Sequence, residues 1–354
     1  MINFGIIGVG WRAEFFFRIA KTCPDLFTIS GIVGRTPAKA QAMADRFSVP
    51  LYSSVEELVR VSKPAFVVTS LPADVNPGVL KLLASLDMPA LSETPPAMSV
   101  DEMNDLCSLV KDGAKIQVAE QYFLQPHHAA RIAFAHSGKI GRVTQAQISA
   151  AHGYHGVSLI RRYLGVGFDN AKVTAMSFKS PIVKGPGRAG PPSKEEIVES
   201  EQTIAQLDFG DRLGIFDFTG SQYFACIRDP RILVRGERGE IVNDSAVYLK
   251  DFLTPIRVSF LRHSAGEHGN LEGHYLKGIQ GGDEWVYRNP AAPGALYDDE
   301  IAIADCLIRM ARHAEGGESF YSLADACQDR YLDIVIREAI AENRTITTST
   351  QGWA

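Results

Sequence analysis

Apolar and polar residues alternate along the first third of the chain with the periods of strands and of helices. Phe4–Ile7 is a short apolar run typical of a buried strand, and residues 13–20 carry apolar side chains at helical spacing until Pro24 ends the segment. Phe27–Val33 reads as a second strand, followed by a helical pattern over residues 36–47. The pattern predicts a strand, a tight turn, an amphipathic helix and a second strand, which together form a βαβ unit.

The same alternation continues to about residue 122. The next segments are predicted strands at Ala65–Ser70, Ala90–Ser92 and Lys115–Ala119 and a predicted helix at Gly78–Leu86. Two more helices begin with capping boxes, Ser54 to Glu57 and Ser99 to Glu102. Strands that alternate with helices at this spacing indicate a parallel, doubly wound sheet. We therefore expect residues 1–122 to form an α/β domain of the Rossmann type.

Beyond residue 122 the pattern is that of an α+β domain with a large, mostly antiparallel sheet. Predicted strands lie at Arg142–Ala150, Thr203–Phe209, Arg212–Thr219, Arg231–Gly236 and Ile256–Phe260, separated by turn signals. Helices near Asp298–Ala314 and Leu323–Glu342 are expected to pack back onto the body of the protein. We expect residues 123–354 to form this second domain.

One segment of the second half is rich in glycine and proline. Lys179–Ser193 is predicted to be a loop, because its composition suits neither a helix nor a central strand. Two interpretations remain open, a lid over a cleft and a surface excursion without a role.

Composition and charge narrow the range of partners. The chain has 354 residues, 45% hydrophobic and 22% charged, with a net charge of −5. This charge gives no general attraction to nucleic acid or to anionic lipid, and no apolar run of about 18 residues is present. The five cysteines show no metal-ligand spacing, and their odd count argues against a disulfide framework. We expect a cytoplasmic protein with neither a nucleic-acid partner nor a membrane partner.

The turn after the first strand carries the clearest chemical signal. Gly8-Val9-Gly10-Trp11-Arg12-Ala13 is a G-x-G-x-x-A motif between a predicted strand and a predicted helix. In this position Gly8 allows the tight turn, Gly10 allows the backbone to approach a diphosphate, and Ala13 allows close packing of helix on strand. The motif predicts a dinucleotide site that includes Val9, Trp11 and Arg12.

The end of the second predicted strand bears on the choice of cofactor. It reads Val33-Gly34-Arg35-Thr36, without the acidic residue that would bind the ribose hydroxyls of NAD. Gly34 leaves space there, and Arg35 and Thr36 can bind a 2′-phosphate by charge and hydrogen bond. The sequence therefore predicts a preference for NADP(H), with NAD(H) as the alternative if Arg35 is only a solvated surface residue.

Several segments in this order resemble the Gfo/Idh/MocA oxidoreductases, the family of glucose-fructose oxidoreductase and inositol dehydrogenase. They are Gly8-Val9-Gly10, Ser70-Leu71-Pro72, Ser92-Glu93-Thr94-Pro95, Glu120-Gln121-Tyr122, Gly153-Tyr154-His155 and Gly236-Glu237-Arg238-Gly239. The resemblance implies hydride transfer between a nicotinamide and a hydroxyl carbon of a sugar, polyol or related compound bound between the two domains. It also implies a homodimer or homotetramer formed through the open sheet.

The chain departs from the family at two positions that concern catalysis. The family supplies a lysine in Glu-Lys-Pro and an Asp-x-x-x-His pair, whereas this chain has Thr94 and Ala151, so only His155 remains. We predict that His155 transfers the proton, with Thr94 and Tyr154 beside it. The alternatives are a histidine that only packs or caps near a helix start, and a dinucleotide-binding sensor or structural protein without catalysis.

The remaining candidates follow predicted strands of the first sheet. Ser70 and Leu71 follow one strand, and Glu93 and Gln121 follow two others, at the edge where doubly wound sheets bind ligands. We expect cofactor contacts from all four, with a purely structural hydrogen-bonding role as the alternative for Glu93 and Gln121. No metal site is expected, because the adjacent His127 and His128 point in different directions on a helix and lack a carboxylate at ligand spacing.

Overall fold

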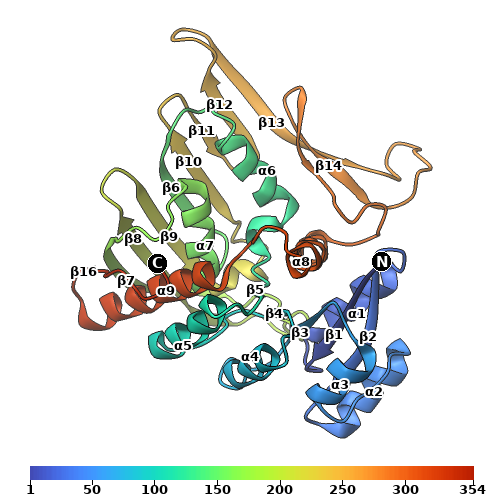
Figure 1. Cartoon of the computed structure of the whole chain (residues 1–354). Helices are drawn as coiled ribbons and strands as arrows, with labels where there is room; N and C mark the ends of the chain where they lie inside the picture. The colour runs from blue at the N-terminus through green and yellow to red at the C-terminus, as the bar shows by residue number, and fades with distance from the viewer.

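The computed structural model describes residues 1–354 and divides them between two sheets (Figure 1). The first sheet has five parallel strands in the order β2-β1-β3-β4-β5. These strands are β1 (Ile2–Ile7), β2 (Phe27–Val33), β3 (Phe66–Thr69), β4 (Ala90–Ser92) and β5 (Ile116–Val118). The order reverses at β1, so the sheet is doubly wound and its switch point lies beside the turn that follows β1.

Five helices connect the strands of this sheet. They are α1 (Ala13–Thr22), α2 (Pro37–Phe47), α3 (Val55–Ser62), α4 (Asn76–Ser85) and α5 (Val100–Lys111). Helix α5 begins with the predicted capping box, since Ser99 and Glu102 each bind the other's backbone N–H. In α3 the box is incomplete, because Ser54 accepts from the N–H of Glu57 while the Glu57 carboxylate binds Ser53. The Rossmann topology predicted for the first part of the chain is confirmed.

The second sheet has eleven strands in the order β15-β14-β13-β12-β11-β10-β6-β9-β8-β7-β16, and only β6 and β9 are parallel neighbours. These strands are β6 (Val143–Ser149), β7 (Lys172–Val183), β8 (Ile197–Asp208), β9 (Leu213–Thr219), β10 (Arg231–Gly236), β11 (Gly239–Val242), β12 (Ser245–Leu249), β13 (Pro255–Ser264), β14 (Leu276–Gly281), β15 (Glu284–Arg288) and β16 (Ile346–Thr347). This confirms the predicted large and mostly antiparallel sheet. The predicted division after residue 122 lies between β5, the last strand of the first sheet, and β6, and it stays a proposal.

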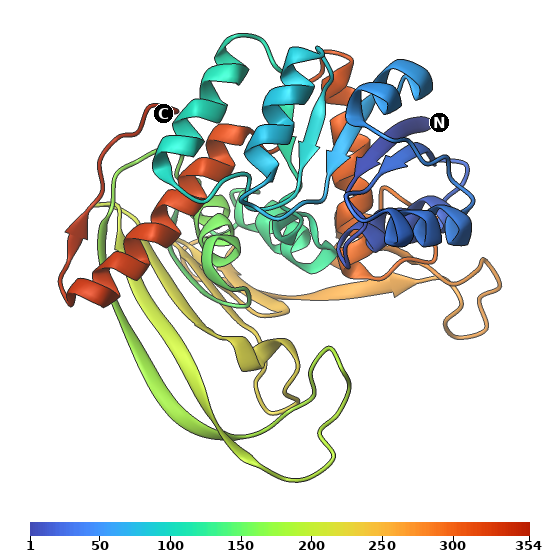
Figure 2. The same cartoon turned by 90° about the horizontal axis from the view of Figure 1, so that it is seen from below.

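Helices cover one face of the large sheet and leave the other bare (Figure 2). The covering helices are α6 (Pro126–Ala135), α7 (Gly153–Leu164) and α9 (Leu323–Glu342). The remaining long helix, α8 (Asp298–Ala314), packs instead against the first sheet. Its Ile303 and Leu307 share a hydrophobic core with Phe4 and Phe16. No helix of the structure has the length and apolarity needed to span a membrane.

The predicted loop over Lys179–Ser193 is wrong in its first part. Lys179–Val183 continues β7 and pairs with Ile197–Glu201 of β8. Pro181 fits there because β16 pairs with β7 only at residues 172 and 173, so the proline lies on an edge where no strand needs its N–H. The loop proper spans residues 184–196.

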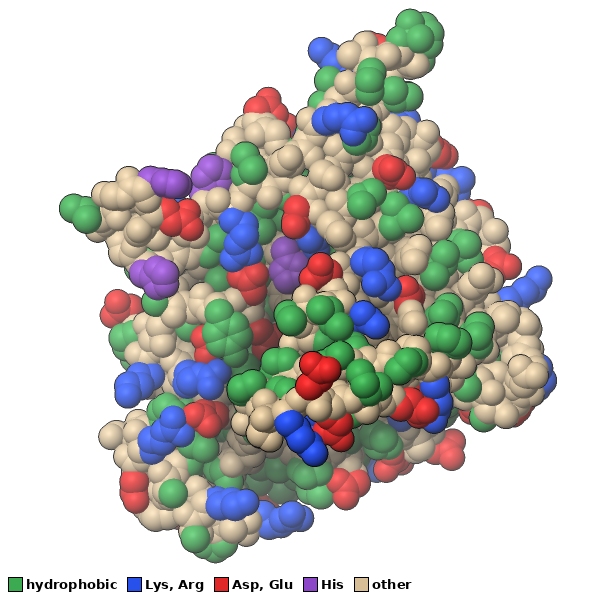
Figure 3. Space-filling view, turned by 180° about the vertical axis from the view of Figure 1, so that it is seen from behind, with side chains coloured by type: hydrophobic (Ala, Val, Ile, Leu, Met, Phe, Trp, Pro, Cys, Tyr) green, Lys and Arg blue, Asp and Glu red, His purple; other side chains and the backbone are tan.

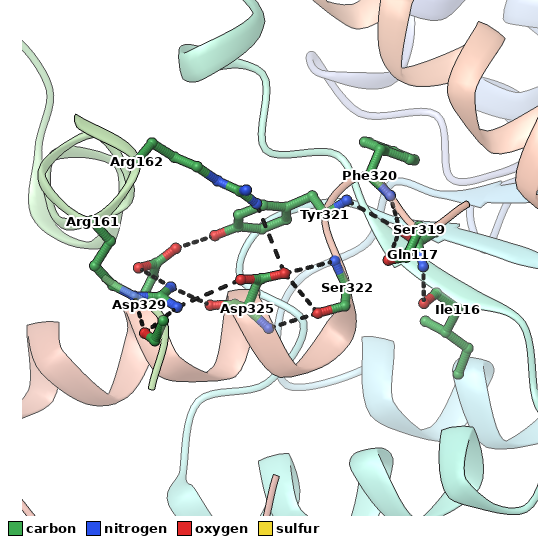
Figure 4. A network of polar contacts seen from close by, with 11 residues as sticks. Ile116, Gln117, Arg161, Arg162, Ser319, Phe320, Tyr321, Ser322, Asp325 and Asp329 are labelled. Atoms are coloured by element: carbon green, nitrogen blue, oxygen red, sulfur yellow. Dashed lines mark hydrogen bonds and ion pairs between the residues drawn. The ribbon is translucent and has the colours of Figure 1, made fainter. Parts of the chain in front are cut away.

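A buried polar network joins the two sheets through α9 (Figure 4). Arg161 of α7 donates to Asp329 of α9 at 2.7 Å, and the hydroxyl of Tyr321 donates to the same carboxylate. Gln117 of β5 accepts hydrogen bonds from the N–H groups of Phe320 and Tyr321. The network therefore fixes α7, which carries His155, relative to β5, which leads to Glu120.

Candidate active site

The turn between β1 and α1 has the backbone that its glycines predict. Gly8 has a φ of +117°, and a Cβ there would lie 2.1 Å from the carbonyl oxygen of Ser70. Val9 packs beside Gly34, whereas a Cβ on Gly10 would meet open space. The turn thus leaves room at Gly10 and places the N-terminus of α1 beside that space, as diphosphate binding requires.

A cavity of about 630 Å³ opens next to this turn, between the first sheet and the second part of the chain. It brings together seven predicted site residues, Trp11, Arg12, Glu93, Thr94, Gln121, Tyr154 and His155. It also takes in Tyr122, Gln125, His152, Arg188, Tyr223 and Asp299, which come from five different segments. The carboxyl ends of β4 and β5 supply Glu93, Thr94 and Gln121, which fits the crevice of a doubly wound sheet.

The structure places the other predicted cofactor residues outside this lining. Ser70 and Leu71 follow β3, and the carbonyl of Ser70 is what holds residue 8 to glycine. Arg35 and Thr36 follow β2, and both are exposed. Arg35 and Thr36 lie at the carboxyl edge of the first sheet, as the nucleotide turn does, but they do not line the cavity.

His155 and Glu120 form the central polar pair of the cavity. The Nδ1 atom of His155 lies 2.5 Å from Oε2 of Glu120, whose side chain is fully buried. Burial raises the pKa of Glu120 to about 8 and lowers the pKa of His155 to about 3, because both charged forms lose hydration. We therefore assign both groups their uncharged forms at neutral pH, with one shared proton between them.

The other ring nitrogen of His155, Nε2, has no partner in the protein. The ring itself is one of those that line the cavity. The ring contacts Tyr122 and Tyr154, with centroid distances of 4.4 and 4.2 Å. His155 is thus held at Nδ1 and by two aromatic neighbours, which leaves Nε2 for a bound ligand.

A chain of hydroxyl and imidazole groups surrounds this pair. Tyr122 donates to the hydroxyl of Tyr223 at 3.1 Å, and that hydroxyl lies 2.6 Å from Nδ1 of His152. Burial lowers the pKa of His152 to about 4, so its ring is neutral at neutral pH. Burial also raises the pKa of Tyr154, and this effect outweighs a hydrogen bond from Thr94 that lowers the same pKa. These groups donate and accept hydrogen bonds without carrying charge.

Arg12 is held by two carboxylates in the cavity wall. It donates to Glu93 at 3.1 Å and to Asp299 of α8 at 2.9 Å. Burial opposes the charge of Arg12, but these ion pairs outweigh it and raise the pKa of the guanidinium. Gln125 also donates to Asp299, at 3.1 Å, so this cluster of one guanidinium and two carboxylates is held together by hydrogen bonds.

Two further details concern the fit of a nicotinamide dinucleotide. Oε1 of Gln121 is buried, lines the cavity and lacks a hydrogen-bond partner in the protein. Such an atom needs a donor, and a carboxamide N–H of a nicotinamide would supply one. Together with the open space at Gly10, the residues present fit a dinucleotide.

The interpretation of Gly34 as empty space for a phosphate is wrong. A Cβ at residue 34 would lie 2.8 Å from the Cβ of Ala40 and 3.1 Å from Val9. Glycine is needed there because α2 and the nucleotide turn pack against the end of β2. Arg35 forms no ion pair and no side-chain hydrogen bond, so its guanidinium is available to a ligand.

The histidines considered for a metal site lie in other contacts. His127 is 3.4 Å from Asp298, and His128 is 3.4 Å from the hydroxyl of Tyr163. No group of three or more His, Cys, Asp or Glu side chains in the structure could hold a metal ion.

Glu120 is a site residue that was not predicted from the sequence. Ala151 stands at the position of the family aspartate and is fully buried in the core. Because the aspartate is missing, the sequence offered no evident partner for His155. The partner comes instead from the end of β5, 35 residues earlier in the chain. The signal was present in Glu120-Gln121-Tyr122, since a carboxylate just after a buried strand of a doubly wound sheet lies at the ligand edge.

The fold is that of the Rossmann class, and the residues of the cavity fit a nicotinamide dinucleotide. Residues 2–121 match a family model described as an oxidoreductase family with an NAD-binding Rossmann fold. This match over the first sheet and its helices confirms the resemblance seen in the sequence. An oxidoreductase family supports the prediction of an NAD(P)-dependent dehydrogenase or reductase.

Individual relatives are distant in sequence. A protein named Putative oxidoreductase YteT, from Bacillus subtilis (strain 168), is 26% identical over 170 residues, which is 45% of this chain and 40% of that protein. The match thus spans less than half of that relative's length.

Solved structures share the fold over the whole chain. Levoglucosan dehydrogenase in complex with NADH and levoglucosan is 18% identical, with a TM-score of 0.70 and 99% of both chains covered. An oxidoreductase from Agrobacterium radiobacter in complex with NAD+, L-tartaric acid and magnesium is 16% identical, with a TM-score of 0.66 and 98% of both chains covered. At this identity the likeness shows a common fold.

Proposed function

We propose that the protein is a dehydrogenase or reductase that transfers hydride between NADP(H) and a hydroxyl or keto carbon of a carbohydrate-like or polyol substrate. The observation that carries the proposal is the buried pair of His155 and Glu120, with Nε2 of His155 unpaired and the ring lining a cavity beside the nucleotide turn. Hydride transfer from an alcohol requires a group that accepts the hydroxyl proton, and we assign this role to His155.

Glu120 determines what His155 can do. When Glu120 is ionised it accepts from Nδ1–H, so Nε2 is a free acceptor that can take the proton of a substrate hydroxyl. When the pair holds one proton more, Nε2–H is a donor that can protonate the oxygen of a keto group. The bound nicotinamide supplies or accepts the hydride, and the protein's part is to hold and move this proton.

Thr94 and Tyr154 orient the substrate in this account. Neither can act as a base near neutral pH, because Thr94 is a hydroxyl and burial raises the pKa of Tyr154. Their hydroxyl groups line the cavity next to His155 and can hydrogen-bond to the hydroxyls of a sugar or polyol. The aromatic rings of the cavity, among them Tyr122, Tyr223 and Phe224, offer apolar faces for the carbon skeleton.

The preference for NADP(H) rests on the end of β2. Arg35 lacks a carboxylate partner and follows the strand where an acidic residue would bind the ribose hydroxyls of NAD. Lys39, one turn into α2, is also exposed and unpaired. Calorimetric titration should give tighter binding for NADPH than for NADH, and Arg35→Ala should remove most of the difference. Tighter binding of NADH by the unchanged protein would contradict this preference.

The competing function is a sensor or structural protein that binds the dinucleotide without catalysis. The replacements at Thr94 and Ala151 favour it, because the lysine and aspartate of the family are both missing. The Glu120 contact restores a partner for His155 and favours the enzyme.

Replacement of His155 separates the two functions. With NADP+ and a panel of sugars and polyols, the unchanged protein should form reduced nicotinamide, and His155→Ala should lower kcat by about 10²-fold or more. Its affinity for NADP+ should stay nearly unchanged. His274→Ala, in an exposed loop of the second domain, is the matched control. Turnover that survives His155→Ala would exclude His155 as the proton carrier, and tight binding with no turnover on any substrate would support the sensor.

A further inference from the structure

We propose that Arg188, at the tip of the loop between β7 and β8, binds the diphosphate of the dinucleotide across the mouth of the cavity. The inference rests on the proposed function, because it requires that the cavity take a dinucleotide. It assigns a cofactor contact to the second part of the chain, in addition to those expected from the Rossmann sheet.

The loop presents Arg188 on a tight turn. The N–H of Gly187 donates to the carbonyl oxygen of Gly190 at 3.0 Å, and the N–H of Gly190 donates to the carbonyl oxygen of Gly187 at 2.9 Å. Gly190 has a φ of +106°, which a residue with a side chain rarely adopts. The turn leaves two residues, Arg188 and Ala189, at its tip, so the position of Arg188 follows from the backbone around it.

The tip reaches back to the nucleotide turn. The guanidinium carbon of Arg188 lies 4.2 Å from the centroid of the Trp11 ring, and Trp11 stands between Gly10 and Arg12. Trp11 is 56% exposed, so this arginine covers a ring that the first domain leaves open to solvent. Stacking on an aromatic ring holds the plane of a guanidinium and leaves the N–H groups at its edge free to donate.

Arg188 also differs from the other arginine of the cavity in its partners. Arg12 donates to Glu93 and Asp299, so its donors and its charge are largely used within the protein. Arg188 has neither a carboxylate partner nor a side-chain hydrogen bond in the structure, although it lines the same cavity. An unpaired guanidinium beside the turn that receives a diphosphate has the charge and the forked donors that phosphate oxygens require.

A carboxylate of the substrate is the competing ligand for Arg188. The positive charge of Arg188 contributes to the lowered pKa of His152. Arg188 therefore also acts on the part of the cavity that contains His152 and His155, where the substrate is proposed to bind. The stack on Trp11 favours the diphosphate, because Trp11 belongs to the turn with open space at Gly10.

Calorimetric titration with ADP-ribose tests the proposal, since ADP-ribose carries the diphosphate but no nicotinamide. Arg188→Ala should weaken the binding of ADP-ribose and of NADP+ by about five- to tenfold, which is the loss expected for one charged contact at a solvent-exposed mouth. Arg188→Lys should give an intermediate loss, and added salt should narrow the difference from the unchanged protein. Arg257→Ala, which removes an exposed and unpaired arginine of β13, is the matched control and should change nothing.

Each other outcome has a definite meaning. An unchanged Kd of Arg188→Ala for ADP-ribose, with a folded protein by thermal melting, overturns the assignment of Arg188 and leaves the proposed function intact. An unchanged Kd for ADP-ribose together with a raised KM for substrate assigns Arg188 to a substrate anion and also overturns the proposal. If the unchanged protein binds neither NADP+ nor ADP-ribose, the proposed function fails with it.

Discussion

Glu120 illustrates how burial changes the chemistry of one carboxyl group. A glutamate in water is ionised at neutral pH, whereas full burial raises the pKa of Glu120 to about 8. Its neighbour His155 is shifted in the opposite direction for the same reason. Because the two groups share a proton, the free nitrogen of His155 becomes a base only as the pair loses a proton.

This coupling predicts the pH dependence of the reaction. Since the pKa of Glu120 is raised, the carboxyl stays protonated at neutral pH and ionises as the pH rises through about 8. Alcohol oxidation should therefore accelerate with pH up to a plateau above that value, and ketone reduction should slow over the same range. Glu120→Gln should abolish this step in a plot of kcat against pH and lower kcat by at least about tenfold.

Glu267→Gln, on an exposed loop, is the control for this variant. A pH profile of Glu120→Gln that coincides with that of the unchanged protein would show that Glu120 does not govern the protonation of His155.

Among individual residues, the glycines of the nucleotide turn could be predicted from the sequence, whereas the hydrogen-bond partner of His155 could not. The glycine motif predicted the turn at Gly8, because a glycine requirement follows from local backbone geometry. The contact between Glu120 and His155 joins two segments 35 residues apart, and no periodicity or spacing of one segment reports on the other. The same reason explains why Asp299 and Arg188 were not identified as neighbours of the nucleotide turn.

At the scale of elements, the start of α5 is a local device whose contribution can be measured. Ser99 accepts from the N–H of Glu102, and the Glu102 carboxylate accepts from the N–H of Ser99. Ser99→Ala should lower the free energy of unfolding in urea by about 1 kcal/mol. Ser108→Ala, which removes an exposed hydroxyl later in the same helix, should change it by less than about 0.5 kcal/mol. Equal losses in both variants would contradict a role for the capping box.

The two sheets differed in how far their elements could be predicted. All five strands of the first sheet were predicted, because parallel strands buried on both faces appear as short apolar runs between helices. In the second sheet β7, β11, β12, β14, β15 and β16 were missed. One face of that sheet carries no helix, so its strands mix polar and apolar residues, and glycine or proline such as Pro181 interrupts them without ending them.

At the scale of the whole molecule, the bare face of the large sheet is the surface on which an oligomer would form. Figure 3 shows the molecule from behind relative to Figure 1, and on this side apolar side chains lie among Lys, Arg, Asp and Glu. On β7, Met176 and Phe178 are 53% and 52% exposed, whereas Val173 on the opposite face is buried. Exposed apolar side chains next to one another on a sheet favour contact with another surface.

We expect a homodimer or homotetramer that uses this face. The double variant Met176→Glu and Phe178→Glu should weaken self-association at least about tenfold in analytical ultracentrifugation, because it places two charges in the interface. Leu271→Glu, at a residue that is 97% exposed in a loop, is the control. A monomeric unchanged protein at micromolar concentration, or an unaltered association of the double variant, would contradict this expectation.

The most direct test of the central claim is a crystal structure of the protein with NADP+ bound. We expect the diphosphate to lie against residues 8–13 and the nicotinamide carboxamide to lie within hydrogen-bond reach of Gln121. The reactive face of the nicotinamide should be turned to His155, with room for one alcohol group between them. A dinucleotide bound elsewhere, or a nicotinamide that faces away from His155 and Glu120, would contradict this claim.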